Sequence, residues 1–131
     1  MKWAALVARL LVGVAFVAFG SNHWLKFIPQ PKMTLPKPAT DFMTALTTTP
    51  YMDVVKVLEV LGGILLLSGR MAPLGLIILV PVTVNIALWD ALLVKYGTPP
   101  LGTVFLVLEV FLLWAYRRHF VGILSTNARV A

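Results

Sequence analysis

Cysteine is absent from this chain, and charged residues are scarce. The 131 residues include no Cys, and Asp, Glu, Lys and Arg together make up only 12%. Without thiols, neither a disulfide framework nor a disulfide-exchange relay can be built from this chain alone. Because a soluble domain carries roughly 25% charged residues, the low charge indicates a membrane protein.

The sequence also lacks the motifs of common cofactor sites. It has no flavin or dinucleotide motif, no pair of haem ligands and no metal-ligand cluster. We therefore expect no metal site, and any electrons would come from a partner protein. The formal net charge is +6, but the basic residues lie beside apolar runs. This position favours contact with anionic lipid over nucleic acid, so we expect no nucleic-acid partner.

What the chain does contain is hydrophobic sequence, which makes up 60% of its residues. Four apolar runs predict membrane spans at about 3–21, 51–69, 73–94 and 100–118. A signal peptide is the competing interpretation of the first run, but Arg9 interrupts it and no small-residue cleavage site follows. The expected fold is a single all-α domain over residues 1–131, an antiparallel four-helix transmembrane bundle.

Residues 25–50 form the one long connection. Prolines at positions 29, 31, 36, 38 and 50 exclude a continuous helix there. The pattern of Phe42, Met43, Ala45 and Leu46 predicts a short amphipathic helix over 41–46 that lies on the membrane, with Thr40 or Asp41 as its cap. We expect a long, Pro-rich outer loop that carries this helix as an ordered lid.

Basic residues predict the orientation. The side that holds both termini carries six Lys and Arg residues, and the opposite side carries four (Lys2, Arg9, Arg70, Arg117, Arg118 and Arg129 against Lys26, Lys32, Lys37 and Lys95). The positive-inside rule then predicts that both termini lie in the cytoplasm and that the loop lies outside.

The second run contains three ionisable residues spaced three apart, namely Asp53, Lys56 and Glu59. A helix stacks them on one side, and charged groups at membrane depth are costly enough to suggest a functional site. Asp53 with Lys56 also fits a simple interfacial pair at a helix start. A rise of about 1.5 Å per residue places polar groups of three helices in one outer layer. We expect this layer to line a ligand-binding site, formed by Asn22, His23, Asp53, Lys56, Glu59, Asn85, Trp89 and Asp90.

Arg9 and Glu109 fall at similar depths in the inner half by the same count. Two buried charges of opposite sign relieve each other, so we expect a structural ion pair between the first and fourth spans.

Three stretches of the sequence resemble the DoxX family of small four-helix membrane proteins. They are FGSNHWLKFIP, VKVLEVLGGILLLSGR and PLGLIILVPVTVNIALWD, and the resemblance covers residues 12 to about 94. It implies an antiparallel four-helix bundle in a bacterial inner membrane. The positions that match the family's recurring residues are Asn22, His23, Lys56, Glu59, Gly62, Gly63, Arg70 and Asn85; many relatives carry a histidine where this chain has Asp90.

The resemblance also implies redox work near the quinone pool. Relatives include the small subunit of a thiosulfate:quinone oxidoreductase and a mycobacterial membrane partner in oxidative-stress complexes. Our leading hypothesis is a redox accessory that holds a quinone or another lipophilic molecule in the outer half and serves a redox partner protein. The alternatives are an assembly subunit without a ligand and a small-solute permease acting as a homo-oligomer.

Overall fold

The computed structural model describes residues 2–29, 34–95, 99–123 and 129–130. Within these ranges the chain is helical and contains no strand, with five α-helices in the order α1 (Lys2–Leu25), α2 (Lys37–Thr47), α3 (Tyr51–Ser68), α4 (Ala72–Leu88) and α5 (Leu101–Ala115). A π-helical turn, η1 (Trp89–Leu93), prolongs α4, and a 3-10 turn, η2 (Arg117–His119), follows α5.

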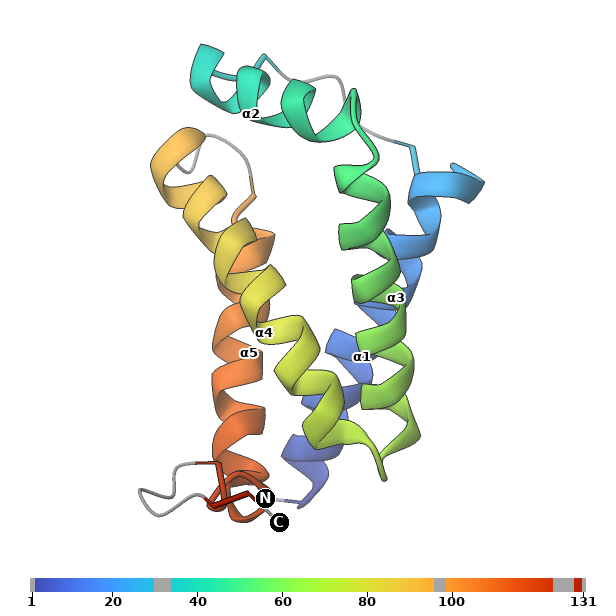
Figure 1. The fold of residues 1–131 in the computed structure, drawn as a ribbon, viewed down its shortest axis with the longest axis vertical. Coiled ribbons are helices and arrows are strands. Elements are labelled where there is room, and N and C mark those ends of the chain that lie inside the picture. The colour runs from blue at the N-terminus through green and yellow to red at the C-terminus, as the bar shows by residue number, and fades with distance from the viewer. Residues whose placement is uncertain (1, 30–33, 96–98, 124–128, 131) are drawn as a thin grey trace.

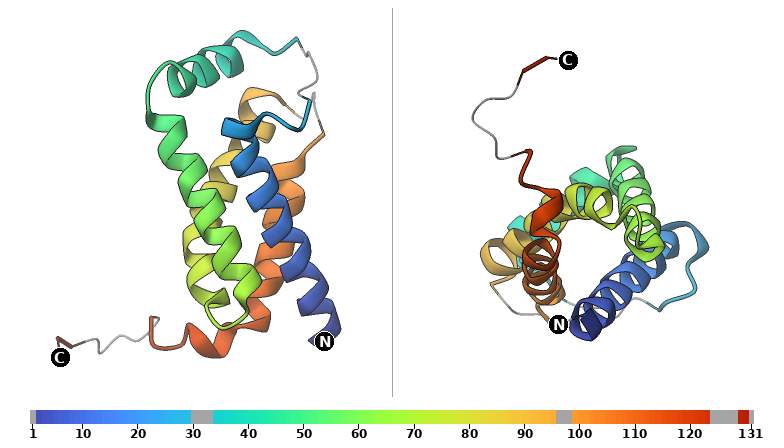
Figure 2. Two further views of the ribbon diagram at one scale, coloured as in Figure 1. Left: turned by 90° about the vertical axis from the view of Figure 1, so that its right-hand side faces the viewer. Right: turned by 90° about the horizontal axis from the view of Figure 1, so that it is seen from below.

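Four helices stand side by side, and the fifth lies across one end of them (Figure 1). Helix α1 packs against α3 and α5, and α4 packs against the same two helices. Helix α2 crosses one end, which we call the α2 end, and the N-terminus lies at the other, which we call the terminal end (Figures 1 and 2). Consecutive long helices run in opposite directions. The α3–α4 turn therefore lies at the terminal end, opposite α2.

Two helical segments are long and apolar enough to cross a membrane by length and composition, Lys2–Leu25 and Ala72–Leu93. Helix α5 is apolar but shorter, with 15 residues. Helix α3 has 18 residues and carries Asp53, Lys56 and Glu59. The first predicted span was too short, because α1 continues through His23 to Leu25.

Glycines allow α1 and α3 to lie close together. A Cβ atom on Gly63 would lie 2.9 Å from the backbone oxygen of Gly13, and one on Gly20 would lie 3.3 Å from the backbone oxygen of Lys56. At such distances a side chain at either glycine would crowd the neighbouring helix. Small residues at these positions therefore allow the two helix backbones to approach closely, as in other membrane helices. The contact sets the spacing at which the polar side chains of α1 and α3 meet.

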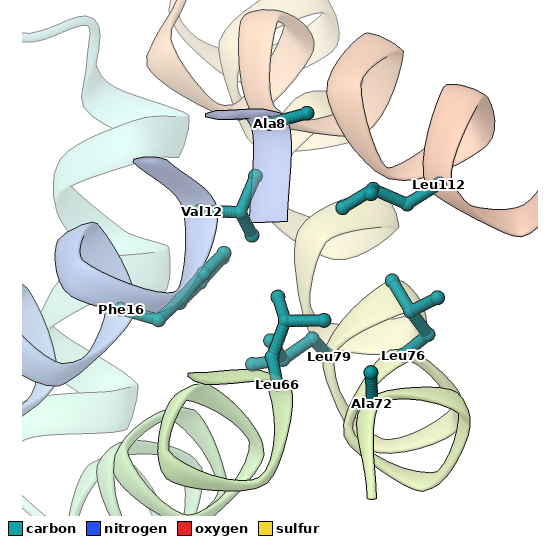
Figure 3. Close-up of a cluster of buried hydrophobic side chains, with 8 residues drawn as sticks. All are labelled: Ala8, Val12, Phe16, Leu66, Ala72, Leu76, Leu79 and Leu112. Carbon is teal, nitrogen blue, oxygen red and sulfur yellow. The ribbon is translucent and has the colours of Figure 1, made fainter. Parts of the chain in front are cut away.

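The apolar core lies toward the terminal end of the bundle, and Figure 3 shows its buried side chains. Its buried side chains come from α1, α3, α4 and α5, and they are Ala8, Val12, Phe16, Leu66, Ala72, Leu76, Leu79 and Leu112. The buried polar residues Asn22, Glu59 and Asp90 lie nearer to α2. Glu109 and Thr83 lie between them and the apolar core.

Helix α2 begins earlier than expected. The prediction of a helix at 41–46 capped by Thr40 or Asp41 was wrong about the start, because α2 begins at Lys37 with Pro38 in its first turn. Proline fits there, where its missing N–H would have no helical partner anyway. The threonine hydroxyls of this segment donate to carbonyl oxygens four residues earlier; these threonines are Thr40, Thr44, Thr47, Thr48 and Thr49. Residues 30–33 of the Pro-rich connection, with Pro31 and Lys32, lie outside the described residues.

Candidate functional site

Lys56 and Glu59 form an ion pair within one turn of α3. Lys56 Nζ lies 3.0 Å from Glu59 Oε2 and 3.4 Å from Oε1. The Glu59 side chain is 3% exposed and that of Lys56 is 22% exposed. The Glu59 Cβ atom lies against Gly20 of α1, where a Cβ on the glycine would be 3.3 Å away. Because Gly20 has no side chain, the Glu59 side chain fits between α1 and α3.

Asn22, His23 and Asp53 meet at the α2 end of the same helix pair. His23 Nε2 lies 2.7 Å from Asp53 Oδ1, which joins α1 to the first turn of α3. Asn22 is buried and bonds the chain that leaves α1, since its Oδ1 accepts from the N–H of Ile28 at 2.7 Å. His23 and Asp53 thus connect α1 to α3, whereas the Asn22 amide bonds the chain at the end of α1.

Asp90 is buried and bonds the start of α5. Its Oδ2 accepts from the backbone N–H of Gly102 at 3.0 Å. The π turn of η1 carries Asp90 toward α5, and this turn closes with the N–H of Val94 bonded to the carbonyl of Trp89 at 3.0 Å. The first N–H groups of a helix have no partner within that helix, so a carboxylate there is favourable. The carboxylate of Asp90 is therefore committed to helix α5.

Two buried polar atoms flank the contact between Asp90 and Gly102. Trp89 Nε1 and Thr103 Oγ1 are both inaccessible to solvent, and neither has a hydrogen-bond partner among the described residues. Each belongs to a residue next in sequence to one member of the bonded pair, so the two atoms lie in the same region of the α2 half. Asn85 is exposed, and its side chain makes no hydrogen bond to another described residue.

The predicted ion pair between Arg9 and Glu109 was wrong. No salt bridge joins them within the described chain; Arg9 Nη1 instead lies 3.5 Å from the hydroxyl of Tyr116. The depth estimate failed because α1 is longer than expected. At about 1.5 Å per residue, Arg9 lies about 24 Å from the α2 end of α1, whereas Glu109 lies about 12 Å from the start of α5.

Glu109 is fully buried, with 0% exposure, and bonds a residue that the sequence did not single out. Thr83 Oγ1 lies 2.8 Å from Glu109 Oε1, and Glu109 Oε2 has no partner among the described residues. Thr83 and Glu109 link α4 to α5. A single hydroxyl within an apolar run was the only sequence signal for this contact.

Two hollows open in the terminal half of the bundle. One, of about 310 Å³, is lined by Lys2, Ala5, Leu6, Arg9, Ala115 and Tyr116. The other, of about 450 Å³, is an apolar groove between α1 and α5 with Trp3, Leu11 and Phe111 in its walls. Neither hollow touches the polar residues near α2. Those residues offer one Lys–Glu ion pair, one His–Asp contact, two helix-end contacts and two unpartnered hydrogen-bonding atoms, a set suited to binding polar atoms.

Comparison with known proteins identifies the family. Residues 4–94 match the DoxX family. The chain is also similar to the uncharacterized protein YwoB of Bacillus subtilis (strain 168), with 42% identity over 65 residues. This match covers 50% of the chain and 42% of YwoB, less than half of that relative. No solved structure gives a significant match. Because the family match covers most of the chain, including α1, α3 and α4, this protein belongs to the DoxX family and is a membrane protein.

Proposed function

We propose that this DoxX-family membrane protein binds a lipophilic molecule with carbonyl oxygens, of the quinone class, in the α2 half of its bundle. The observation that carries the proposal is the Nε1–H of Trp89, a buried donor without an acceptor in the described chain. A buried donor without a partner costs about 1–3 kcal/mol, and proteins seldom leave one unused. A ligand carbonyl is an acceptor that would satisfy it.

The surroundings of Trp89 support a small-molecule contact. Thr103 Oγ1 is a second buried atom without a partner, at the start of the neighbouring helix α5. Ligand sites in proteins combine apolar walls with a few directed polar groups. A π turn interrupts the helix at Trp89–Leu93, and such turns occur often at functional sites. The proposal does not use Asn22 and Asp90 as ligand contacts, because their side chains bond the backbone of the protein.

Two pairs of ionisable side chains in the α2 half support a role in quinone reduction, because they can carry protons. Lys56 is partly exposed beside buried Glu59, and His23 with Asp53 lies at the end of the same helix pair. Quinone reduction takes up protons, and these side chains are groups that can carry them. The electrons would come from a partner protein, so the chain would act as an accessory subunit of a quinone-linked oxidoreductase.

The test removes each of the two unpartnered groups and keeps an aromatic ring at position 89 and a branched side chain at position 103. Trp89→Phe removes the N–H and Thr103→Val removes the hydroxyl, while Trp3→Phe, at an exposed position near the other end, is the matched control. We expect short-chain quinone analogues to bind the purified wild-type protein and the control equally, and the Trp89 variant about tenfold more weakly. Equal affinity in all four proteins, or no saturable binding to the wild type, would refute the site.

A second candidate is an assembly subunit without a ligand. This candidate is favoured because several predicted site residues already bond other groups of the protein. These contacts are His23 with Asp53, Lys56 with Glu59, and Asp90 with Gly102. In this case the polar groups only hold the helices in register, and α2 would be available to a partner. Mass spectrometry of the small molecules extracted with the purified protein separates the two candidates, because an assembly subunit retains no quinone.

A further inference from the structure

From the charges at the other end of the molecule we infer that the terminal end of the bundle holds a second binding site, for an oxyanion of the phosphate class, centred on Arg9. The site is the hollow of about 310 Å³ between the first turns of α1 and the end of α5. Figure 2 (right) looks onto this end, where the start of α1 lies beside the last turns of α5. It lies at the opposite end from the proposed quinone site and does not depend on it.

The positive charge of Arg9 has no side-chain carboxylate as a partner. The chain contains five Asp and Glu residues, all within the described ranges. Each of them bonds another group: Asp41 bonds Lys37, Asp53 bonds His23, Glu59 bonds Lys56, Asp90 bonds Gly102 and Glu109 bonds Thr83. A cation partly removed from water without a counterion is unfavourable. An anion from outside the protein would balance it.

The guanidinium of Arg9 also retains hydrogen-bond donors. Its Nε is buried and has no partner among the described residues, and its Nη1 reaches only the hydroxyl of Tyr116, at 3.5 Å. Gly69 makes room for the group at the end of α3, because a Cβ there would lie 2.5 Å from Nη1. The C-terminal end of α3 supplies about half an elementary negative charge, which offsets only part of the charge on Arg9.

The other polar groups that line the hollow complete a set of donors. The Tyr116 hydroxyl accepts from Arg9, so its own hydrogen is free to point to a ligand. Lys2 lines the same hollow at its mouth. A planar guanidinium with a hydroxyl and an ammonium matches an anion with several oxygens, as in phosphate. Basic pockets between helices at a membrane surface bind phosphate head groups of lipids, and a free phosphate ion offers the same chemistry.

The experiment has one arm for each source of phosphate. Calorimetric titration of the full chain in neutral detergent with inorganic phosphate tests the free ion. Native mass spectrometry after reconstitution in nanodiscs of mixed phosphatidylglycerol and phosphatidylcholine tests retention of the anionic lipid. We expect saturable phosphate binding if the free ion is the ligand, and selective retention of phosphatidylglycerol if the ligand is a lipid head group.

Variants assign the binding to Arg9. We expect Arg9→Gln to weaken it by on the order of 10- to 100-fold, and Tyr116→Phe by about threefold to tenfold. Arg118→Gln removes an exposed charge at the same end, outside the hollow, and should leave the affinity unchanged. If Arg9→Gln does not fold, Tyr116→Phe decides. Binding that is absent in both arms, that survives Arg9→Gln or Tyr116→Phe, or that falls equally in Arg118→Gln would overturn the inference.

Discussion

The hydroxyl of Thr83 lies 2.8 Å from Oε1 of Glu109 and 3.0 Å from the backbone oxygen of Leu79. A hydroxyl carries one hydrogen, so it either shares this hydrogen between the two oxygens or donates it fully to one of them. If Thr83 donates to Leu79, then the contact with Glu109 requires a proton on the carboxyl group. With no cation bonded to Glu109 among the described residues and 0% exposure of its side chain, we expect it to be a neutral acid.

Glu109→Gln tests this expectation. The amide can donate to Thr83 as the protonated acid does, so we expect the thermal stability in detergent to stay within about 1 kcal/mol of wild type. Glu109→Ala, in contrast, should lose roughly 2–4 kcal/mol because it leaves a cavity between α4 and α5. A Gln variant more stable than wild type by several kcal/mol would show instead that the native carboxyl is charged and uncompensated.

Gly63→Ala tests the close contact between α1 and α3. The added methyl would lie 2.9 Å from the backbone oxygen of Gly13, so the helices must separate. We expect a loss of roughly 1–3 kcal/mol, seen as a lower midpoint of thermal unfolding. Gly122→Ala is the control, because a Cβ there has nothing within 4 Å. Equal stability of the two variants would contradict the close helix contact.

Lys56→Met tests the pair in α3. It leaves the buried Glu59 carboxylate without its cation, and we expect a loss of roughly 1–3 kcal/mol. Replacing both residues, with Lys56→Met and Glu59→Leu, should recover part of this loss, because an apolar pair of similar volume needs no partner. Asp53→Asn at the more exposed His23 contact should cost less than about 1 kcal/mol. A double variant as unstable as Lys56→Met would contradict the pairing.

Asp90→Ala tests the contact that fixes the start of α5. It removes the acceptor of the Gly102 N–H, and we expect a loss of roughly 1–2 kcal/mol with faster hydrogen exchange in the first turn of α5. Asp90→Asn keeps an acceptor oxygen and should lie closer to wild type. If exchange rises in α3 but not in α5, then Asp90 stabilises a different part of the protein.

The helices and part of the polar arrangement could be predicted from the sequence. Apolar runs located the four long helices, and the expected outer layer included His23 and Asp53, which are in contact. The prediction failed where it depended on helix length, because α1 is longer than α5 and Arg9 contacts Tyr116, just after the end of α5, instead of Glu109. It also missed Thr83, Thr103 and Tyr116. The role of a hydroxyl group in an apolar helix depends on neighbours that are distant in sequence, and the sequence alone does not identify them.

The bonding of the threonines in and just after α2 affects how readily this segment can leave water for lipid. By composition the segment looks hydrophilic, yet its hydroxyl hydrogens are engaged by carbonyl oxygens of the same segment. Fewer hydrogen bonds to water are then lost when the helix moves from water into the head-group region. We therefore expect helix α2 to enter a lipid head-group region more readily than a hydropathy count suggests.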